Sequence, residues 1–75
     1  MKIAVVDDER PARSELSFLI TDILPEAEIL EAASGAAALE LFLSTPDISL
    51  AFLDINLNDM EGTTLAAAMQ KILPD

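Results

Sequence analysis

Short runs of apolar residues alternate along the chain with longer segments in which apolar residues recur every three or four positions. The short runs predict β-strands, and they cover residues 2–6 (KIAVV), 27–32 (AEILEA) and 48–53 (ISLAFL). The longer segments have the period of an amphipathic α-helix, and they cover the stretch between Pro11 and Pro25, residues 35–43 and residues 63–73. This alternation of strand and helix predicts one α/β domain with parallel strands, right-handed connections and helices on both faces of the sheet.

Proline and a capping residue support the ends of these helices. Pro11 stands where a helix tolerates proline best, in its first turn, and Pro25 stops the same helix. Ser34 can cap the second helix, which ends before Pro46 because a residue that precedes proline resists helical geometry. The boundaries of the predicted elements therefore rest on local chemistry as well as on periodicity.

The same pattern predicts which side chains face the core. In the first helix the apolar stripe is Ala12, Leu16, Leu19, Ile20 and Ile23, and the residues expected to face away are Arg13, Ser17 and Asp22. The stripe of the third helix is Leu65, Met69, Ile72 and Leu73. Glu28 and Glu31 indicate that strand 27–32 is less buried and lies at an edge of the sheet.

Composition narrows the class of protein. Fourteen acidic and four basic residues give a formal net charge of -10, which disfavours direct binding to nucleic acid. The chain has neither cysteine nor histidine, so a zinc site is not expected. No apolar run has the length of a signal peptide or a membrane helix, and we expect a soluble cytoplasmic protein. The 52% of hydrophobic residues is high for 75 residues, and it indicates either an unusually rich core or apolar surface that contacts something beyond this chain.

Three carboxylates follow predicted strands directly. Asp7 and Asp8 end the first strand, and Asp54 ends the third. Parallel strands deliver their carboxyl ends to one rim, so the three carboxylates share a crevice if these two strands are neighbours. Carboxylates so close together favour a cation, and Mg²⁺ prefers oxygen ligands of this kind.

Simpler interpretations apply to some of these acids. Asp7 or Asp8 taken alone would more often be a helix cap or a turn residue, and Asp59 and Glu61 are interpreted as ordinary turn and helix-start residues. A calcium loop beginning at Asp54 fails, because its sixth position is Asp59 and not glycine, and its twelfth is Leu65 and not glutamate.

Three segments together resemble the receiver domain of response regulators: VVDDE (5–9), AASGAAALELF (32–42) and FLDINLNDMEG (52–62). The opening VVDDERPARSEL is most similar to that of LytTR-type regulators. The resemblance implies a three-layer flavodoxin-like fold with strand order 2-1-3, and a histidine kinase that donates a phosphoryl group to Asp54. It also implies Mg²⁺ bound directly by Asp8, Asp54 and the backbone carbonyl of Asn56, with Asp7 acting mainly through water.

The chain departs from the family pattern in two ways. Asn58 replaces a proline that is usual in the turn after the acceptor. Receiver domains also have fourth and fifth strand–helix units that supply a Ser/Thr and a lysine to the site, so we expect residues 1–75 to form a partial receiver domain without them and without an output domain. Lys71, at the far end of the third helix, is not expected to replace that lysine.

Two other functions compete with phosphoryl acceptance. A phosphorylation-silent interaction module would keep the acidic pocket and pair with another protein or copy; we expect self-association through strand 48–53 and helix 63–73. A phosphohydrolase with an aspartyl nucleophile is disfavoured because it needs a second acid two residues after Asp54, where this chain has Asn56. We therefore expect no enzyme activity.

Overall fold

The computed structural model describes residues 1–55 and 57–72, with the side chain of Ile72 excluded. All six predicted elements are present, and most ends agree with the sequence pattern to within one residue. They are β1 (Lys2–Val6), α1 (Arg10–Ile23), β2 (Glu28–Ala32), α2 (Gly35–Ser44), β3 (Ile48–Leu53) and α3 (Gly62–Ile72).

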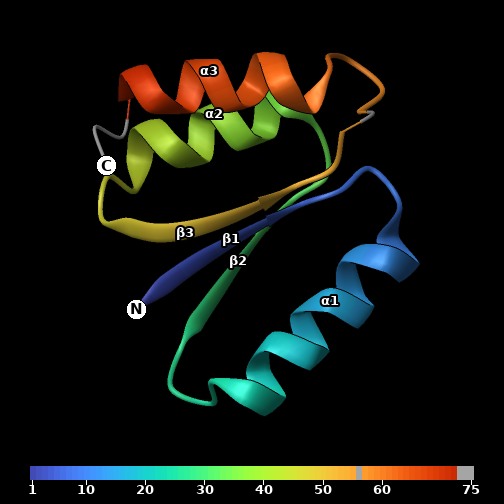
Figure 1. Cartoon of the computed structure of the whole chain (residues 1–75), viewed down its shortest axis with the longest axis vertical. Coiled ribbons are helices and arrows are strands. Elements are labelled where there is room, and N and C mark those ends of the chain that lie inside the picture. Colours follow the sequence, from blue (N-terminus) through green and yellow to red (C-terminus); the bar gives the residue numbers. More distant parts are fainter. Residues whose placement is uncertain (56, 73–75) are drawn as a thin grey trace.

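The three strands form one parallel sheet in the order β2-β1-β3. Helices α2 and α3 lie side by side on one face of this sheet, and α1 lies on the other (Figure 1). This arrangement confirms the predicted α/β fold, its 2-1-3 strand order and the edge position of β2, whose Glu28 and Glu31 are exposed.

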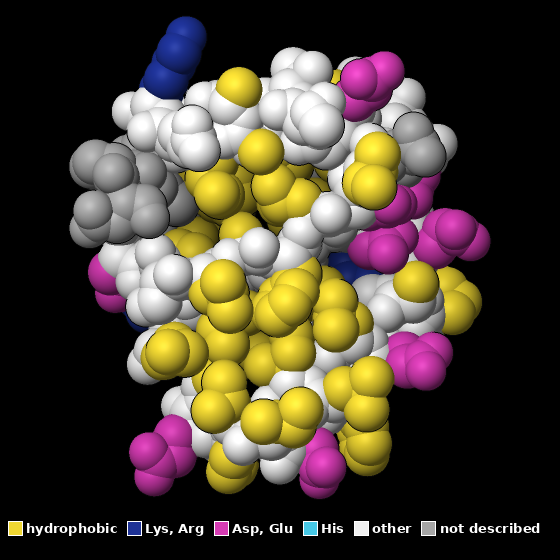
Figure 2. All heavy atoms as spheres, viewed as in Figure 1, with side chains coloured by type: hydrophobic (Ala, Val, Ile, Leu, Met, Phe, Trp, Pro, Cys, Tyr) yellow, Lys and Arg dark blue, Asp and Glu magenta, His cyan; other side chains and the backbone are white. Residues whose placement is uncertain are grey.

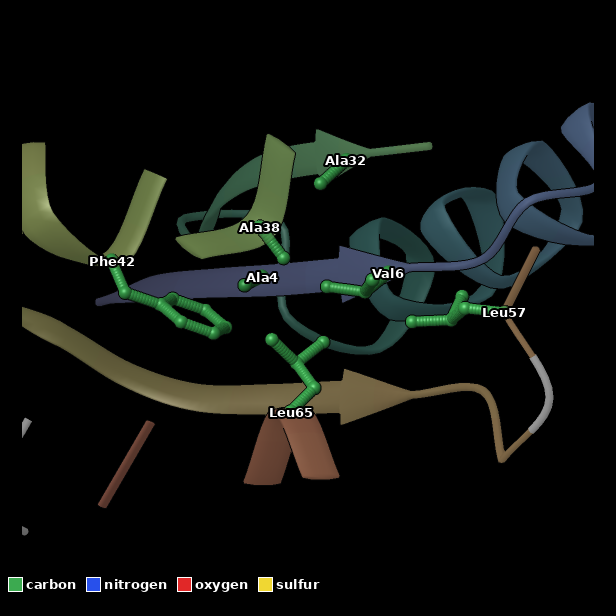
Figure 3. Packing of buried hydrophobic residues seen from close by; sticks show 7 residues of the cluster. All are labelled: Ala4, Val6, Ala32, Ala38, Phe42, Leu57 and Leu65. Carbon is green, nitrogen blue, oxygen red and sulfur yellow. The ribbon is translucent and has the colours of Figure 1, made fainter. Parts of the chain in front are cut away.

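The face of the sheet that α2 and α3 cover is tightly packed. Its buried side chains come from β1, β2, α2 and α3 and from the segment after β3, and they converge in Figure 3; they are Ala4, Val6, Ala32, Ala38, Phe42, Leu57 and Leu65. Phe42 and Leu65 are fully buried. Leu65 of the predicted α3 stripe therefore faces the core as expected, and the half-buried Met69 packs against the same cluster. Leu73 and the side chain of Ile72 lie outside the described part of the chain.

The face that α1 covers has a smaller core. Ile3, Val5 and Ile20 are buried there, with Leu16, Ala27 and Ile29 packed against them. Of the predicted α1 stripe, Ala12, Leu19 and Ile23 are exposed, because α1 lies over β1 and β2 and leaves this face of β3 uncovered. Leu50 and Phe52 of β3 are exposed as a result.

Candidate metal and phosphoryl site

The backbone pairing of the sheet continues for one residue past β1 and β3 and so fixes where the acids lie. The Asp7 amide donates to the Ala32 carbonyl (3.1 Å), and the Asp54 amide donates to the Val6 carbonyl (3.0 Å). Asp7 and Asp54 thus leave two neighbouring strands at the same rim. The predicted condition for a shared crevice, that the first and third strands are neighbours, is met.

The carboxylates of Asp7, Asp8 and Asp54 lie together at this rim. Each offers one oxygen, and these oxygens lie within 4.8 Å of one another. All three residues are half-buried, and Asp7 and Asp54 line a pocket of about 220 Å³ whose apolar walls are Val6, Leu16, Phe52 and Leu53. Partial burial weakens the hydration that would otherwise screen their mutual repulsion, so a bound cation would lower the energy of the cluster.

The donor set suits a small hard cation. Oxygen ligands in an octahedron around Mg²⁺, at about 2.1 Å from the ion, are at most about 4.2 Å apart. Adjacent ligands in such an octahedron are about 3.0 Å apart, so carboxylate oxygens within 4.8 Å of one another would move closer by side-chain rotation, or one carboxylate would bind through water. Asn56, the fourth predicted ligand, lies outside the described residues.

Arg13 lies near the site, on a side of α1 that the sequence pattern did not predict. Its guanidinium donates to the Asp7 carbonyl (2.9 Å) and to the Glu31 carboxylate (2.8 Å), and its side chain is only 15% exposed. Ser17 also donates to Glu31 (3.2 Å). The prediction that Arg13 and Ser17 face away is therefore wrong. The strand register could have indicated it, because Glu31 pairs with Val5 and so points to the α1 face.

The loop after Asp54 folds back tightly on its own backbone. The Leu57 amide donates to the Met60 carbonyl (3.1 Å), and the Gly62 amide donates to the Ile55 carbonyl (2.7 Å). Gly62 is required for close approach, because a Cβ at this position would collide with the backbone of Asp54 and Ile55. Leu57 is buried in the core beneath the loop and lies beside Val6 in Figure 3.

Asp59 connects this loop to the N-terminus of α2. Its two carboxylate oxygens accept from the Gly35 amide (2.8 Å) and the Ala36 amide (2.9 Å). These bonds from Ala36 and Gly35 hold the pKa of Asp59 below its ordinary value. The predicted cap, Ser34, is confirmed and accepts from the Ala37 amide (3.0 Å). Asp59 is thus more than a turn residue, and local sequence could not show this because its partners lie more than twenty positions away.

Both lysines of the chain lie away from the acids. Lys2 begins β1 at the opposite rim and forms an ion pair with Asp47 (3.0 Å), which raises the pKa of Lys2 and lowers that of Asp47. Lys71 lies in the last turn of α3, about 13 Å along the helix from Gly62. Within the part of the chain that the structure describes, no helix has the length and apolar character needed to cross a membrane.

A family model for the response regulator receiver domain matches residues 3–75. The chain belongs to this family. As a receiver domain it is a module of two-component signalling, and its acidic cluster lies at the strand ends, where the sequence predicted it.

Curated relatives and solved structures agree with this assignment. The receiver domain is 40% identical over 72 residues to the transcriptional regulatory protein LytR of Staphylococcus aureus (strain N315), covering 96% of this chain and 29% of that protein. It is 40% identical over 74 residues to the sensory transduction protein LytR of Streptococcus agalactiae serotype V (strain ATCC BAA-611 / 2603 V/R), with 96% and 30% covered. The chain therefore spans less than a third of the length of these relatives.

Among solved structures, the receiver domain of the hybrid histidine kinase CckA superposes with a TM-score of 0.87 at 30% identity, covering 97% of this chain and 67% of that one. A response regulator receiver domain protein from Clostridium thermocellum gives a TM-score of 0.86 at 27% identity, with 97% and 57% covered. The fold of the described residues is thus that of the corresponding part of known receiver domains.

Proposed function

We propose that this receiver domain accepts a phosphoryl group on Asp54 from the phosphohistidine of a histidine kinase. The observation that carries the proposal is the convergence of Asp7, Asp8 and Asp54, whose carboxylate oxygens lie within 4.8 Å of one another at the rim where β1 and β3 end. Membership of the receiver family supports the kinase as partner. The cytoplasm, where such a kinase presents its phosphohistidine, is the expected location.

In the transfer, an Asp54 carboxylate oxygen forms a bond to phosphorus while the bond from phosphorus to the imidazole nitrogen breaks. The nitrogen keeps the electron pair, and Asp54 becomes an acyl phosphate. Mg²⁺ bound by Asp8, Asp54 and the Asn56 carbonyl, with Asp7 holding a ligating water, would neutralise charge on the phosphoryl oxygens. The hydrogen bond from the Asp54 amide to Val6 holds the acceptor at the rim in the position from which it reacts.

A small-molecule phosphodonor with Mg²⁺ tests this function. We expect one phosphoryl group per chain, mapped to Asp54 by mass spectrometry, and no labelling of Asp54→Asn. Asp47→Asn is the matched control, because it removes an acid at the opposite rim of the sheet. Labelling that persists in Asp54→Asn would refute the assignment of the acceptor.

Labelling should be slow even in the wild-type chain, because neither lysine lies at the acidic cluster. One charge-assisted hydrogen bond to phosphate contributes about 1.5–3 kcal/mol, which corresponds to about ten- to a hundredfold in rate relative to a receiver that has a lysine beside its acceptor.

A second candidate function, self-association as an interaction module, is favoured by the uncovered apolar surface. Leu50 and Phe52 of β3 are 48% and 38% exposed, and Leu19 and Ile23 of α1 are 49% and 75% exposed. Figure 2 shows hydrophobic side chains gathered between the α2–α3 layer and α1. Of the predicted surface, strand 48–53 supplies Leu50 and Phe52, whereas Leu65 of helix 63–73 is buried; α1 adds apolar side chains that the sequence had assigned to the core.

Two copies would cover this surface by pairing their β3 edges, which carry no charged side chain. Because the net charge of -10 opposes association, added salt should tighten the dimer. Sedimentation equilibrium at high micromolar concentration tests the idea, with Phe52→Ser as the variant expected to dissociate. A wild-type chain that is folded and monomeric would contradict this second function and leave phosphoryl acceptance untouched.

A further inference from the structure

We propose that Asp59 is a positioning residue that fastens the loop after Asp54 to α2, so that a ligand bound at the acidic cluster and the N-terminus of α2 are coupled. The ligand considered is Mg²⁺, and to that extent the inference rests on the proposed function. Asp59 itself is not placed among the metal ligands.

The contacts of Asp59 form a two-point attachment. One oxygen accepts from the Gly35 amide and the other from the Ala36 amide. These amides belong to the first turn of α2, where a helix has no acceptors of its own. A carboxylate at a helix N-terminus is also favoured by the helix dipole. The attachment therefore joins groups that would otherwise lack partners within their own elements.

The same loop touches α2 at a second place. The side chain of Met60 packs so closely on Gly35 that a Cβ there would collide with its Cγ, Sδ and Cε atoms. At its other end the loop is closed onto the Asp54 backbone by Gly62 and by the bond from the Gly62 amide to Ile55. The described backbone after Asp54 is thus attached to the Asp54 backbone at one end and to α2 at the other, which is the geometry that the proposed coupling requires.

Four variants test the coupling, with Mg²⁺ affinity measured by titration of the amide NMR signals. Asp59→Ala should weaken Mg²⁺ binding about tenfold, at the lower end of the effect of residues that orient metal ligands. Asp59→Asn should weaken Mg²⁺ binding less, because the amide keeps one acceptor oxygen. This variant also replaces Asp59→Ala in the test if Asp59→Ala does not fold.

Two matched controls separate coupling from simpler effects. Ser34→Ala removes the neighbouring acceptor of the same helix turn without touching the loop. Glu61→Gln removes a negative charge from the same loop at an exposed position. Both should stay within about twofold of the wild type. A loss in Ser34→Ala equal to that in Asp59→Ala would overturn the proposal in favour of helix stability, and an equal loss in Glu61→Gln would overturn it in favour of plain charge.

Hydrogen exchange keeps the test independent of the metal. The Leu57 and Gly62 amides, which close the loop, should exchange faster in Asp59→Ala than in Ser34→Ala. If the wild type binds no Mg²⁺, the metal part of the proposed function fails, and the exchange result alone decides whether Asp59 holds the loop. Equal exchange in the two variants would overturn the coupling.

Discussion

The two faces of the sheet are built differently. On one face, α2 and α3 together cover all three strands, and seven buried side chains form a continuous core with Phe42 and Leu65 at no exposure. On the other face, a single helix covers β1 and β2, the buried core is Ile3, Val5 and Ile20, and Phe52 and Leu50 of β3 remain exposed. We call these the closed face and the open face.

The difference shows which part of the molecule supports the site. Leu57, in the loop after Asp54, belongs to the core of the closed face, and Leu65 anchors the start of α3 in the same core. Asp59 ties the loop to a helix of that face. The open face contributes a hydrogen bond from Arg13 to the Asp7 carbonyl. It also leaves exposed the apolar surface through which self-association was proposed.

The largest expected effect compares one phenylalanine from each face. Phe42→Ala on the closed face should lose about 3–5 kcal/mol of the free energy of unfolding, because the site is fully buried and leaves a cavity. Phe52→Ala on the open face should lose less than about 1 kcal/mol in the monomer. Urea denaturation at low protein concentration measures both. Similar losses in the two variants would show that the faces do not differ in packing.

A smaller effect concerns the hydrogen bonds that Arg13 donates on the open face. Arg13→Ala should cost about 1–3 kcal/mol, because it removes the donor to the half-buried Asp7 carbonyl and one of the two donors to the Glu31 carboxylate, which keeps its bond from Ser17. Arg10→Ala, at an exposed position in the same helix turn, is the control and should change stability by less than about 0.5 kcal/mol. The comparison between faces would need revision if Arg10→Ala cost as much as Arg13→Ala.

The smallest effect is a dependence of stability on pH that arises at the closed face. The folded-state pKa of Asp59 is lowered by its bonds from Ala36 and Gly35, so its contribution is present above the ordinary aspartate pKa of about 3.9 and is lost as pH falls through the lower folded value. Below about pH 4, the wild type should therefore lose stability more steeply than Asp59→Asn. Parallel curves for urea midpoint against pH in the two proteins would contradict this assignment.

The sequence predicted the elements and their order because these depend on local patterns. Short apolar runs, apolar residues at helical spacing, Pro11, Ser34 and Pro25 act within a few residues, and the strand ends then place Asp7, Asp8 and Asp54 at one rim once the sheet order is known. The acids cluster because neighbouring parallel strands end at the same rim of the sheet.

What the sequence did not predict depends on contacts between distant segments. The partners of Asp59 lie in α2, and that of Arg13 lies on β2. The exposure of Ile23 follows from where α1 lies over the sheet, since an apolar stripe does not specify how much of it a neighbouring element covers. Helical periodicity alone therefore placed Arg13 on the wrong side.

The central claim is that Asp7, Asp8 and Asp54 form one divalent-cation site on a receiver domain. A Mg²⁺ titration of the wild-type chain and of Asp8→Ala, followed by amide NMR, tests it most directly. We predict that residues 7–9 and 54–57 shift first in the wild type and that Asp8→Ala weakens binding about tenfold or more. Unchanged Mg²⁺ affinity in a folded Asp8→Ala chain would contradict the shared site.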